Sequence, residues 1–450
     1  PGMHSSQNEQ DSRHYAIAAK VPMLEPADSA EALFFTKEAF ELSEKFDTPV
    51  LLRMCTRIAH SQSIVETGTR MDIAKKPYVK DGAKYIMMPG NAKRRHPIVE
   101  ARTAALTEFA EDCPYNRIET GGTDIGIITS GTAYQYVKEI FGNTVSVFKL
   151  GLIHPLPVRS LLEFSKKVKK LYVIEELDGV IESHCRSIGL KVTGKDMFSC
   201  IGEFSQATLA KAFGFPEKAH FTTASNIPVR PPVMCAGCPH RGMYYTLAKN
   251  NVTVLGDIGC YTLGAQPPLC ALDSTLCMGA SVSGLHGFNK AGIADGKKAV
   301  CVIGDSTFMH SGVTGLINIA YNGSNSTVII LDNSITGMTG HQQNPTTGYN
   351  IKGDPAGKID LEALCRSIGI RRVTVVDPYD LTACERVLKE ELAADEPSVI
   401  ISRRPCVLLK YVKPKTPLHV SPDKCKSCKK CMKFGCPAIS IHCLLYTSPS

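Results

Sequence analysis

The chain has 450 residues, more than one compact core holds, and its 43% hydrophobic and 21% charged residues are typical of a multi-domain globular protein. No run of 18 apolar residues occurs, which argues against a membrane span. The net charge of +8 is mild for this length, and without an arginine-rich stripe it favours an acidic protein partner over nucleic acid.

The first 62 residues are expected to contain a helix from Ser29 to Lys45 and a strand-like run at residues 49–54. The apolar residues at mostly helical spacing in that helix are Ala32, Leu33, Phe40 and Leu42. Residues 63–122 are polar and interrupted by Gly, Pro and Lys/Arg, which indicates a linker that crosses between domains.

Short apolar runs alternate with helical patterns from residue 123 onward. The expected strands are Ile125–Thr129, Thr144–Phe148 and Lys170–Ile174 within residues 123–229, and Val252–Leu255, Ala299–Ile303, Thr327–Leu331 and Ser398–Ile401 within residues 230–420. Continuous apolar strands separated by helices predict an α/β fold with doubly wound parallel sheets. A Pro-rich crossing at Ile227–Pro232 separates the two regions. The stretch 421–442 is short, basic and rich in cysteine. Residues 443–450 are expected to be a non-native tail.

The 18 cysteines predict thiols and cluster or metal ligands in a reducing cytoplasm rather than disulfides, because no secretion signal is visible. Five of them are expected to be small buried hydrophobic residues: Cys55, Cys185, Cys200, Cys270 and Cys365. Because Pro1 is an implausible native start, we expect the chain to be a fragment.

Polar residues follow two expected strands in a pattern that predicts a phosphate and magnesium site. Gly304 and Asp305 come after one strand, and Asn333 follows the next strand 28 positions beyond Asp305. Ligands of doubly wound sheets bind beyond the carboxyl ends of the strands. Glycine lets the backbone approach a phosphate, while carboxylate and amide oxygens suit Mg²⁺.

This pair resembles the signature of thiamine-diphosphate enzymes, with Ser306 in place of the third glycine as in the ferredoxin-linked 2-oxoacid branch. The wider sequence resembles the large (alpha) subunit of the indolepyruvate ferredoxin oxidoreductase family, up to about His442. The stretches that carry the resemblance are His4–Asp11, Cys235–Arg241, Asp257–Tyr261, Gly304–Gly312, Leu331–Asn333 and Met338–Gln342.

The resemblance implies a set of residues for thiamine diphosphate. Asp305, Asn333 and the carbonyl of Ile335 would hold Mg²⁺. The residues that would line the cofactor are Gly304, Ser306, Gly279, Ala280, Thr339 and Gly340. The family's catalytic glutamate would lie upstream of Pro1. The resemblance further implies a pyrimidine-binding remnant (1–62), a transketolase-C-terminal-like domain (123–229), a diphosphate-binding domain (230–420) and a partial ferredoxin-like module (421–442).

Cysteines near the end of the chain predict an iron–sulfur cluster. Cys425, Cys428, Cys431 and Cys436 follow C-x2-C-x2-C-x4-C-P, one residue longer in the last gap than bacterial ferredoxins. Zinc is the alternative, although zinc sites usually separate their ligand pairs. No second ferredoxin motif follows in the sequence, so half of a two-cluster module is expected.

A second, dispersed set consists of Cys235, Cys238, Cys260 and Cys406. Relatives in the resembled family hold a proximal [4Fe–4S] cluster with cysteines at matching places. Buried thiols at strand ends remain the alternative, because four distant cysteines provide no spacing test.

Three further features bear on chemistry. Met338 stands where pyruvate-specific relatives carry asparagine, so its thioether favours an aromatic substrate, with a core methionine as the alternative. His240 and His310, together with His341, border the cofactor motifs and could donate protons or contact phosphate, although structural roles are as plausible. The lysines around the cysteine run could attract acidic ferredoxin; they are Lys424, Lys426, Lys429, Lys430 and Lys433.

The resemblance therefore implies thiamine-dependent oxidative decarboxylation of arylpyruvates to acyl-coenzyme A, with electrons passed through [4Fe–4S] clusters to ferredoxin. The expected partners are the small beta subunit, ferredoxin, coenzyme A and the arylpyruvate, with no nucleic acid and no membrane. Two alternatives remain open: a thiamine-dependent decarboxylase or synthase without redox chemistry, and a non-catalytic electron-transfer subunit.

Overall fold

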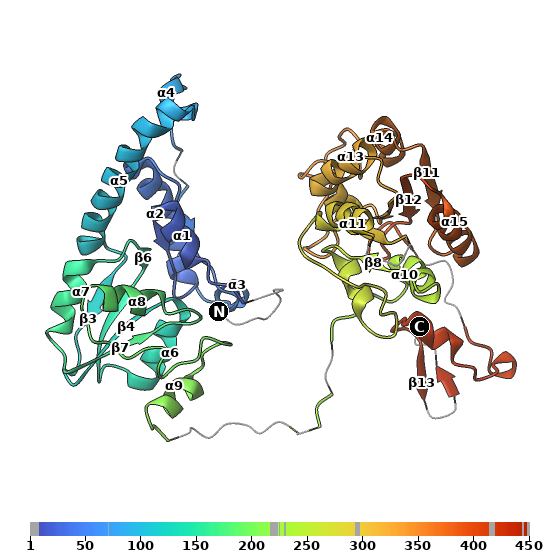
Figure 1. The fold of residues 1–450 in the computed structure, drawn as a ribbon. Helices are drawn as coiled ribbons and strands as arrows, with labels where there is room; N and C mark the ends of the chain where they lie inside the picture. Colours follow the sequence, from blue (N-terminus) through green and yellow to red (C-terminus); the bar gives the residue numbers. More distant parts are fainter. Residues whose placement is uncertain are drawn as a thin grey trace. The chain divides into compact units, whose positions relative to one another are not determined.

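The computed structural model describes residues 9–70, 72–216, 224, 226–228, 231–292, 298–413, 419–442 and 445–447. The chain divides into two compact units, Pro1–Thr223 and Ala224–Ser450, and Figure 1 labels most of the helices and several of the strands. Both units are α/β and contain parallel strands, which confirms the predicted fold class. Among the described residues, no helix combines the length and the apolar character needed to cross a membrane.

Unit 1 alternates helices and short strands. Its helices are α1 (Arg13–Ala19), α2 (Ser29–Phe46), α3 (Thr56–His60), α4 (Gly82–Tyr85), α5 (Pro89–Asp112), α6 (Gly131–Phe141), α7 (Val158–Ser165), α8 (Val180–Ser187) and α9 (Gln206–Ala212). Its strands are β1 (Met23–Leu24), β2 (Leu51–Leu52), β3 (Arg117–Glu119), β4 (Ile125–Ser130), β5 (Ser146–Leu150), β6 (Leu152–His154) and β7 (Lys170–Ile174). The strands form two sheets, ordered β2-β1-β6 and β3-β5-β4-β7.

The larger sheet of unit 1 is covered on both faces because successive side chains of a strand point to opposite sides. Ile128 and Val173 pack into one buried cluster, and Ile127 and Ile174 pack into another that includes residues of α6. Strands β5, β4 and β7 run parallel, and β3 pairs antiparallel with β5 at one edge. The predicted strands in this region are confirmed.

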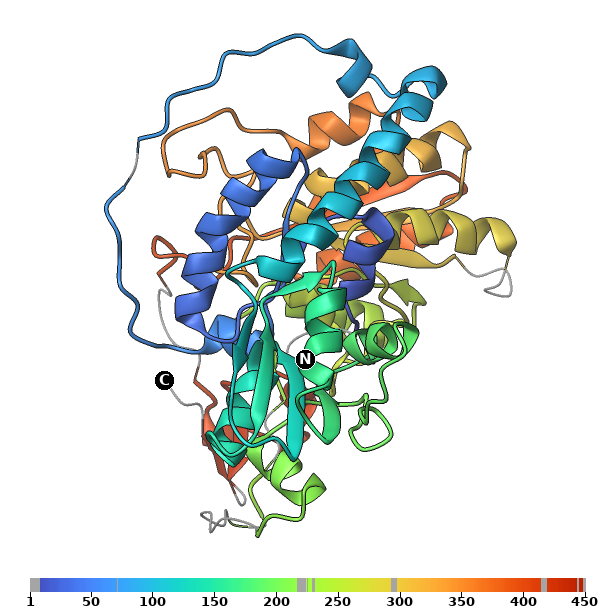
Figure 2. The same ribbon diagram turned by 90° about the vertical axis from the view of Figure 1, so that its left-hand side faces the viewer.

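The expected linker is only partly a linker. Residues 82–119 contain α4, the 24-residue helix α5 and β3, so that interpretation was wrong for its second half. The helix escaped detection because its buried residues are only Leu106 and Ala110 and Pro97 lies inside it. The described residues between 61 and 81 form no helix or strand and run as an extended segment outside the body of unit 1 (Figure 2).

A buried charge network links the first helix of unit 1 to the end of β7. Arg13, 2% exposed, pairs with Asp11 and Glu175 and donates to the carbonyl oxygens of Glu176 (2.9 Å) and Asp178 (2.8 Å). Burial alone would raise the pKa of Asp11, but the hydrogen bonds and charge of Arg13 hold it at about 2. Arg13 therefore neutralises carboxylates that have little access to water.

Unit 2 carries the second α/β sheet and the cysteine-rich end. Its helices are α10 (His240–Lys249), α11 (Ala280–Ala291), α12 (Asp305–Thr307), α13 (Val313–Tyr321), α14 (Leu361–Ser367) and α15 (Leu381–Ala393), with shorter helical turns η1 (Cys260–Ala265), η2 (Phe308–Gly312), η3 (Pro422–Lys424) and η4 (Lys430–Phe434). Its strands are β8 (Val254–Leu255), β9 (Val300–Gly304), β10 (Thr327–Asp332), β11 (Arg372–Val376), β12 (Ser398–Arg403), β13 (Ser440–His442) and β14 (Leu445–Thr447).

The five-stranded sheet of unit 2 is entirely parallel, in the order β11-β12-β10-β9-β8. Val302 and Ile329 pack into a cluster with residues of α10 and α15, and Ile303 and Val328 pack into the opposite cluster with residues of α11, α13 and α14. The predicted strands of this region are confirmed. Strand β11 was not predicted, since it lies at the sheet edge and Val375 is 37% exposed.

Three sequence expectations about burial were wrong. Cys55, Cys185 and Cys365 are buried as predicted, but Cys200 and Cys270 are exposed in loops, where the surrounding apolar residues do not cover them. On α2, Leu42 is buried while Phe40 is 71% exposed, and Phe35 takes the core position instead. Two of the predicted stretches lie partly outside the described residues. Residues 9–11 of the His4–Asp11 motif are described, and so are residues 445–447 of the expected tail, which form β14 and pair with β13.

Candidate functional site

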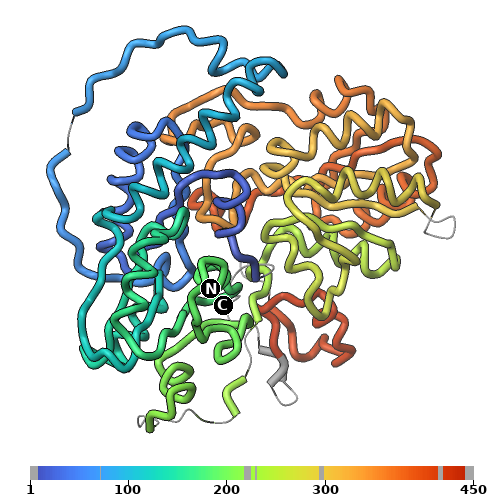
Figure 3. The backbone as a smooth tube through the Cα atoms, turned by 60° about the vertical axis from the view of Figure 1, so that its left-hand side comes forward, coloured from blue at the N-terminus to red at the C-terminus, as the bar shows by residue number. Residues whose placement is uncertain are grey.

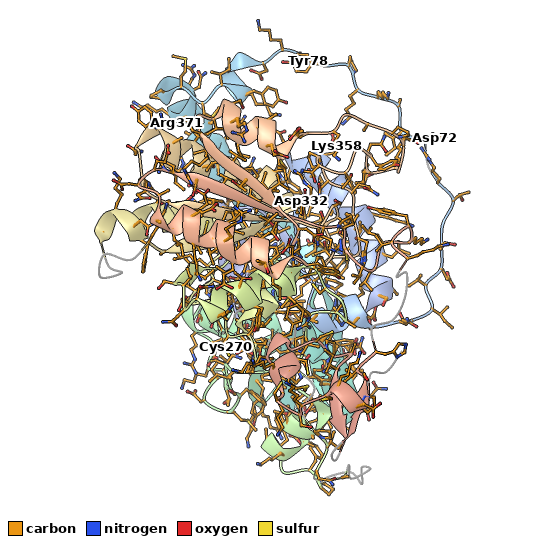
Figure 4. The ribbon with its side chains drawn as sticks, turned by 90° about the vertical axis from the view of Figure 1, so that its right-hand side faces the viewer. Asp72, Tyr78, Cys270, Asp332, Lys358 and Arg371 are labelled. Carbon is orange, nitrogen blue, oxygen red and sulfur yellow. The ribbon has the colours of Figure 1, made fainter. Side chains whose placement is uncertain are left out.

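The carboxyl edge of the unit 2 sheet brings the two predicted strand ends together. Strands β9 and β10 are parallel neighbours, with Gly304 opposite Leu331, so Asp305 and Asn333 emerge at the same edge. Asp332, labelled in Figure 4, is the last residue of β10 at this edge. A pocket of about 110 Å³ opens there. Its lining residues are Ile258, Gly259, Cys260, Tyr261, Met278, Gly304, Asp305, Ser306, Thr307, Leu331, Asn333, Ile335, Thr336, Gly337, Met338 and Thr339.

Asp305 is a buried carboxylate whose hydrogen-bond partners are all neutral. It is 2% exposed and accepts hydrogen bonds from Asn344 Nδ2 (3.2 Å) and Thr346 Oγ1 (3.1 Å). Burial, followed by the charge of Asp332, raises its pKa to about 7. Within the described part of the chain no cationic side chain pairs with it. A buried charge of this kind needs a counterion, so the donor set fits a bound divalent cation.

Asn333 is held on both sides of its amide. Its Nδ2 lies 3.3 Å from Nε2 of His240, and its Oδ1 accepts from the backbone N–H of Ile335 at 3.3 Å. His240 is 4% exposed, and burial lowers its pKa to about 4, so the ring is neutral and its Nε2 can accept from the amide. His240 therefore orients Asn333 and does not itself line the pocket.

A second buried carboxylate, Asp257, holds the start of α11. It is fully buried and accepts the backbone N–H groups of Gly279 (2.9 Å) and Ser281 (3.2 Å) at the start of α11. Gly279 has a φ of +87°, and a Cβ there would lie 2.3 Å from Oγ of Ser311. The conformation and the close packing both require glycine.

The other predicted cofactor residues divide into two groups. Ser306, Met338 and Thr339 line the pocket, and Ser306 accepts a hydrogen bond from Thr336 (2.8 Å). Gly279, Ala280 and Gly340 are not among its lining residues. His310 is exposed and lies 3.2 Å from Ser311, so the structure does not place this predicted catalytic residue at the pocket. It follows Asp305 by five positions, and the helical turn carries it outward.

The four dispersed cysteines lie near one another in unit 2. Burial raises the pKa of Cys260, and negative charge on Cys406 and Cys235 raises it further. Burial also raises the pKa of Cys238 to about 12, with smaller contributions from Cys235 and Cys406. The N–H of Cys406 donates to the carbonyl of Asn333 at 2.9 Å, and Cys260 lines the pocket. Cys260 therefore lies at the pocket, and Cys406 is hydrogen-bonded to Asn333, which also lines it.

The loop that carries Cys235 and Cys238 is anchored to the rest of unit 2. The hydroxyl of Tyr379 donates to the carbonyl of Gly237 at 2.6 Å, and the Arg404 guanidinium stacks 3.8 Å from the Tyr379 ring centre. Within the described residues, no three cysteine sulfurs lie within 4.8 Å of one another.

The C-terminal cysteine run wraps through turns rather than regular helices. Ser427, Lys429 and Gly435 have positive φ angles, which let the chain reverse direction between cysteines. The N–H of Ser427 points at Sγ of Cys425 (3.4 Å), a kind of contact that tunes cluster thiolates. The five predicted lysines around the run are exposed.

Sequence reasoning missed several residues of this site. Asn344 and Thr346 reach Asp305 from a long loop, and Asp257 acts through backbone N–H groups 22 positions away. These pairs follow no fixed spacing. A signal existed only for Asp257, which stands at the end of a predicted strand as Asp305 does.

The chain is similar in sequence to known thiamine-dependent proteins. Residues 257–402 match the family model of the thiamine pyrophosphate enzyme, C-terminal TPP binding domain. Over 98% of its length the chain is 36% identical to the indolepyruvate oxidoreductase subunit IorA of Archaeoglobus fulgidus and 37% identical to that of Thermococcus kodakarensis, covering 75% of each. A solved 2-oxoglutarate:ferredoxin oxidoreductase from Magnetococcus marinus matches 40% of this chain and 66% of its own, at 18% identity and a TM-score of 0.34, too low to add to the assignment.

Proposed function

This chain belongs to the family of indolepyruvate oxidoreductase subunit IorA, and from that premise we propose that it catalyses thiamine-dependent oxidative decarboxylation of arylpyruvates. An arylpyruvate, coenzyme A and two oxidised ferredoxins yield the aryl-acetyl-coenzyme A, CO₂, two reduced ferredoxins and one proton. The observation that carries the proposal is the buried pair Asp305 and Asn333 in one pocket, within the segment that matches thiamine pyrophosphate enzymes.

The pocket residues have distinct roles in this proposal. Asp305 and Asn333, with the carbonyl of Ile335, hold Mg²⁺, and the cation binds the diphosphate. When bound, thiamine diphosphate supplies the carbanion chemistry that releases CO₂ from a 2-oxoacid. His240 keeps the amide of Asn333 oriented, so that Oδ1 faces the cation. Ser306 and Thr336 fix each other beside the site.

The raised pKa of Asp305 predicts that metal binding depends on pH. Only the ionised carboxylate binds a cation, so the affinity for Mn²⁺ or Mg²⁺ should fall about tenfold between pH 8 and pH 6, centred on the pKa of about 7. The same shift lowers the stability of the metal-free chain as the pH rises from about 4 to 7, because only the folded state keeps the proton. The affinity is measured at each pH by titrating Mn²⁺ and following its electron paramagnetic resonance signal. Thiamine diphosphate is left out, because its phosphate also titrates in this range. An affinity for Mn²⁺ that does not change between pH 6 and pH 8 would contradict the prediction.

Electrons leave through the two sets of cysteines in this proposal. Cys235, Cys238, Cys260 and Cys406 hold a [4Fe–4S] cluster beside the pocket, and Cys425, Cys428, Cys431 and Cys436 hold a second one. The first set is supported by its position next to the pocket that Cys260 also lines. The exposed lysines around the second set provide a positive surface for acidic ferredoxin. A small beta subunit completes the enzyme, and a reducing cytoplasm suits the clusters.

Met338 is proposed to select the aromatic side chain of the substrate. It lines the pocket and is 52% exposed, so its thioether is free to contact a ligand. Burying an arylmethyl group removes about 100–200 Å² of apolar surface from water, a few kcal/mol at about 25 cal/mol per Å². Met338→Asn should therefore shift kcat/KM by roughly 10–200-fold from indolepyruvate toward pyruvate. Tyr321→Asn, an exposed change in the same unit, is the control; an unmoved ratio would place selection elsewhere.

The proposed function is tested with the complete enzyme, purified anaerobically with its partner subunit. Arylpyruvates, pyruvate and 2-oxoglutarate are compared by coenzyme-A-dependent reduction of ferredoxin. Highest kcat/KM with an arylpyruvate is the expected result. Decarboxylation without ferredoxin reduction would instead identify a non-redox decarboxylase.

A further inference from the structure

Neighbouring residues at the start of α10 connect the loop of Cys235 and Cys238 with the pocket and with the C-terminal cysteine run. Cys238 and Pro239 lead into it, His240 reaches Asn333, and Arg241 reaches the C-terminal cysteine run. The Nη1 of Arg241 donates to the carbonyl of Gly435 at 2.5 Å and to that of Phe434 at 3.4 Å. Figure 3 shows the C-terminal run, in red, folded against the yellow-green segment that contains α10.

The same guanidinium also holds the loop of the dispersed cysteines. Its Nε donates to the carbonyl of Cys235 at 3.4 Å, and its Nη2 donates to that of Met234. One planar group therefore bonds carbonyls on both sides of the junction between the two cysteine sets. Only arginine has enough donors in a rigid fork for this arrangement.

The charge of Arg241 has no carboxylate partner among the described residues, although the residue is 2% exposed. Burial lowers its pKa, and the charged groups that raise it are the thiols Cys238, Cys436 and Cys235. A buried cation surrounded only by carbonyl dipoles is costly unless an anion faces it. A cluster bound by four thiolates is a net anion, and cysteines of both sets face this guanidinium.

Gly435 completes the contact from the other side. Its φ is +67°, and a Cβ there would lie 2.7 Å from Cδ of Pro268 and 3.2 Å from Nη1 of Arg241. The ring of Phe434 packs 5.7 Å from that of Tyr245 on α10. The C-terminal run is thus seated on α10 by shape as well as by hydrogen bonds.

We propose that Arg241 is the positioning residue for electron transfer between the two cysteine sets: it seats the C-terminal run on α10 and places one buried positive charge between them. The electron-transfer part of this inference rests on the proposed function. The role of Arg241 in holding the C-terminal run on α10 is independent of that function. A positive charge next to both clusters stabilises their reduced forms and raises their reduction potentials.

Two variants separate the seating from the charge. Arg241→Met removes both the hydrogen bonds and the charge at similar volume, whereas Gly435→Ala displaces the run but keeps the charge. Arg386→Met, an exposed arginine on α15 that pairs with Glu390, is the control. The complete enzyme is studied by amide hydrogen exchange of residues 430–439, by iron content and by redox titration with a chemical reductant.

Both variants should increase amide exchange in 430–439 by about tenfold or more, because the seated turn opens more often. Arg241→Met alone should shift the potential of the cluster beside the pocket to more negative values, and Arg241→Lys should restore part of that shift but little of the exchange protection. The rate at which substrate electrons reach the C-terminal cluster should fall about 10–100-fold in Arg241→Met. Arg386→Met should match the parent enzyme.

Unchanged exchange and unchanged potentials in Arg241→Met would overturn the inference. A parent enzyme whose clusters accept electrons from the chemical reductant but not from any 2-oxoacid would overturn the proposed function instead. In that case the exchange and potential measurements still decide the role of Arg241.

Discussion

Asp305→Asn should weaken the binding of thiamine diphosphate with Mg²⁺ by more than about 100-fold and abolish 2-oxoacid turnover. Mutations of residues that merely support a metal ligand cost about 10–100-fold, and Asp305 is proposed as the only charged ligand. Its carboxylate is buried, and its hydrogen bonds from Asn344 and Thr346 aim it into the pocket. Isothermal titration of thiamine diphosphate at fixed Mg²⁺ measures the change.

Asp354→Asn is the matched control, because Asp354 lies in the same long loop but is exposed, and its hydrogen-bond partner among the described residues is Asn350. It should bind the cofactor like the parent chain. The amide of the Asp305→Asn variant also removes the pH dependence of metal binding between pH 6 and 8. Full affinity in Asp305→Asn would show that the cation binds elsewhere.

Arg13→Met should destabilise unit 1 by about 3–5 kcal/mol, the typical cost of leaving a buried charge without its partner. The change removes the ion-pair partner of Glu175 and the nearer of the two arginines that pair with Asp11. Both carboxylates are at most 1% exposed, and two carbonyls at the end of β7 lose their donors as well. Because the chain has two units, a single melting temperature is not a sound measure. The denaturant dependence of amide exchange in β4 and β7 reports unit 1 directly.

Arg57→Met provides the comparison for that measurement. Arg57 pairs with Glu203 at the surface and is 49% exposed, so its loss should cost at most about 1 kcal/mol. Equal effects of the two substitutions would show that the Arg13 network adds no more than a surface ion pair.

Much of the fold followed from the sequence because buried parallel strands are continuous apolar runs. The strands β7, β9, β10 and β12 were predicted to within two residues at either end. Elements that are stabilised by few buried side chains were missed. Helix α5 has two buried residues, and in the edge strand β11 only Val373 and Val376 are buried.

The candidate site was predictable where chemistry follows strand ends. Asp305 and Asn333 were found because parallel strands bring their carboxyl ends to one edge. His240 was placed near the cofactor, but its contact with Asn333 depends on how α10 packs, which periodicity does not encode. The loop residues Asn344 and Thr346 and the bridging contacts of Arg241 depend on tertiary packing in the same way.

Electron paramagnetic resonance of the anaerobic enzyme, assembled with its partner subunit and mixed with indolepyruvate without ferredoxin, tests most directly whether 2-oxoacid oxidation feeds clusters in this chain. The pocket beside Cys260, Cys238 and Cys406 predicts the signal of a reduced [4Fe–4S] cluster within one turnover, and its loss in Cys406→Ser. Consumption of indolepyruvate with release of CO₂ but no such signal, in enzyme whose clusters a chemical reductant does reduce, would contradict it.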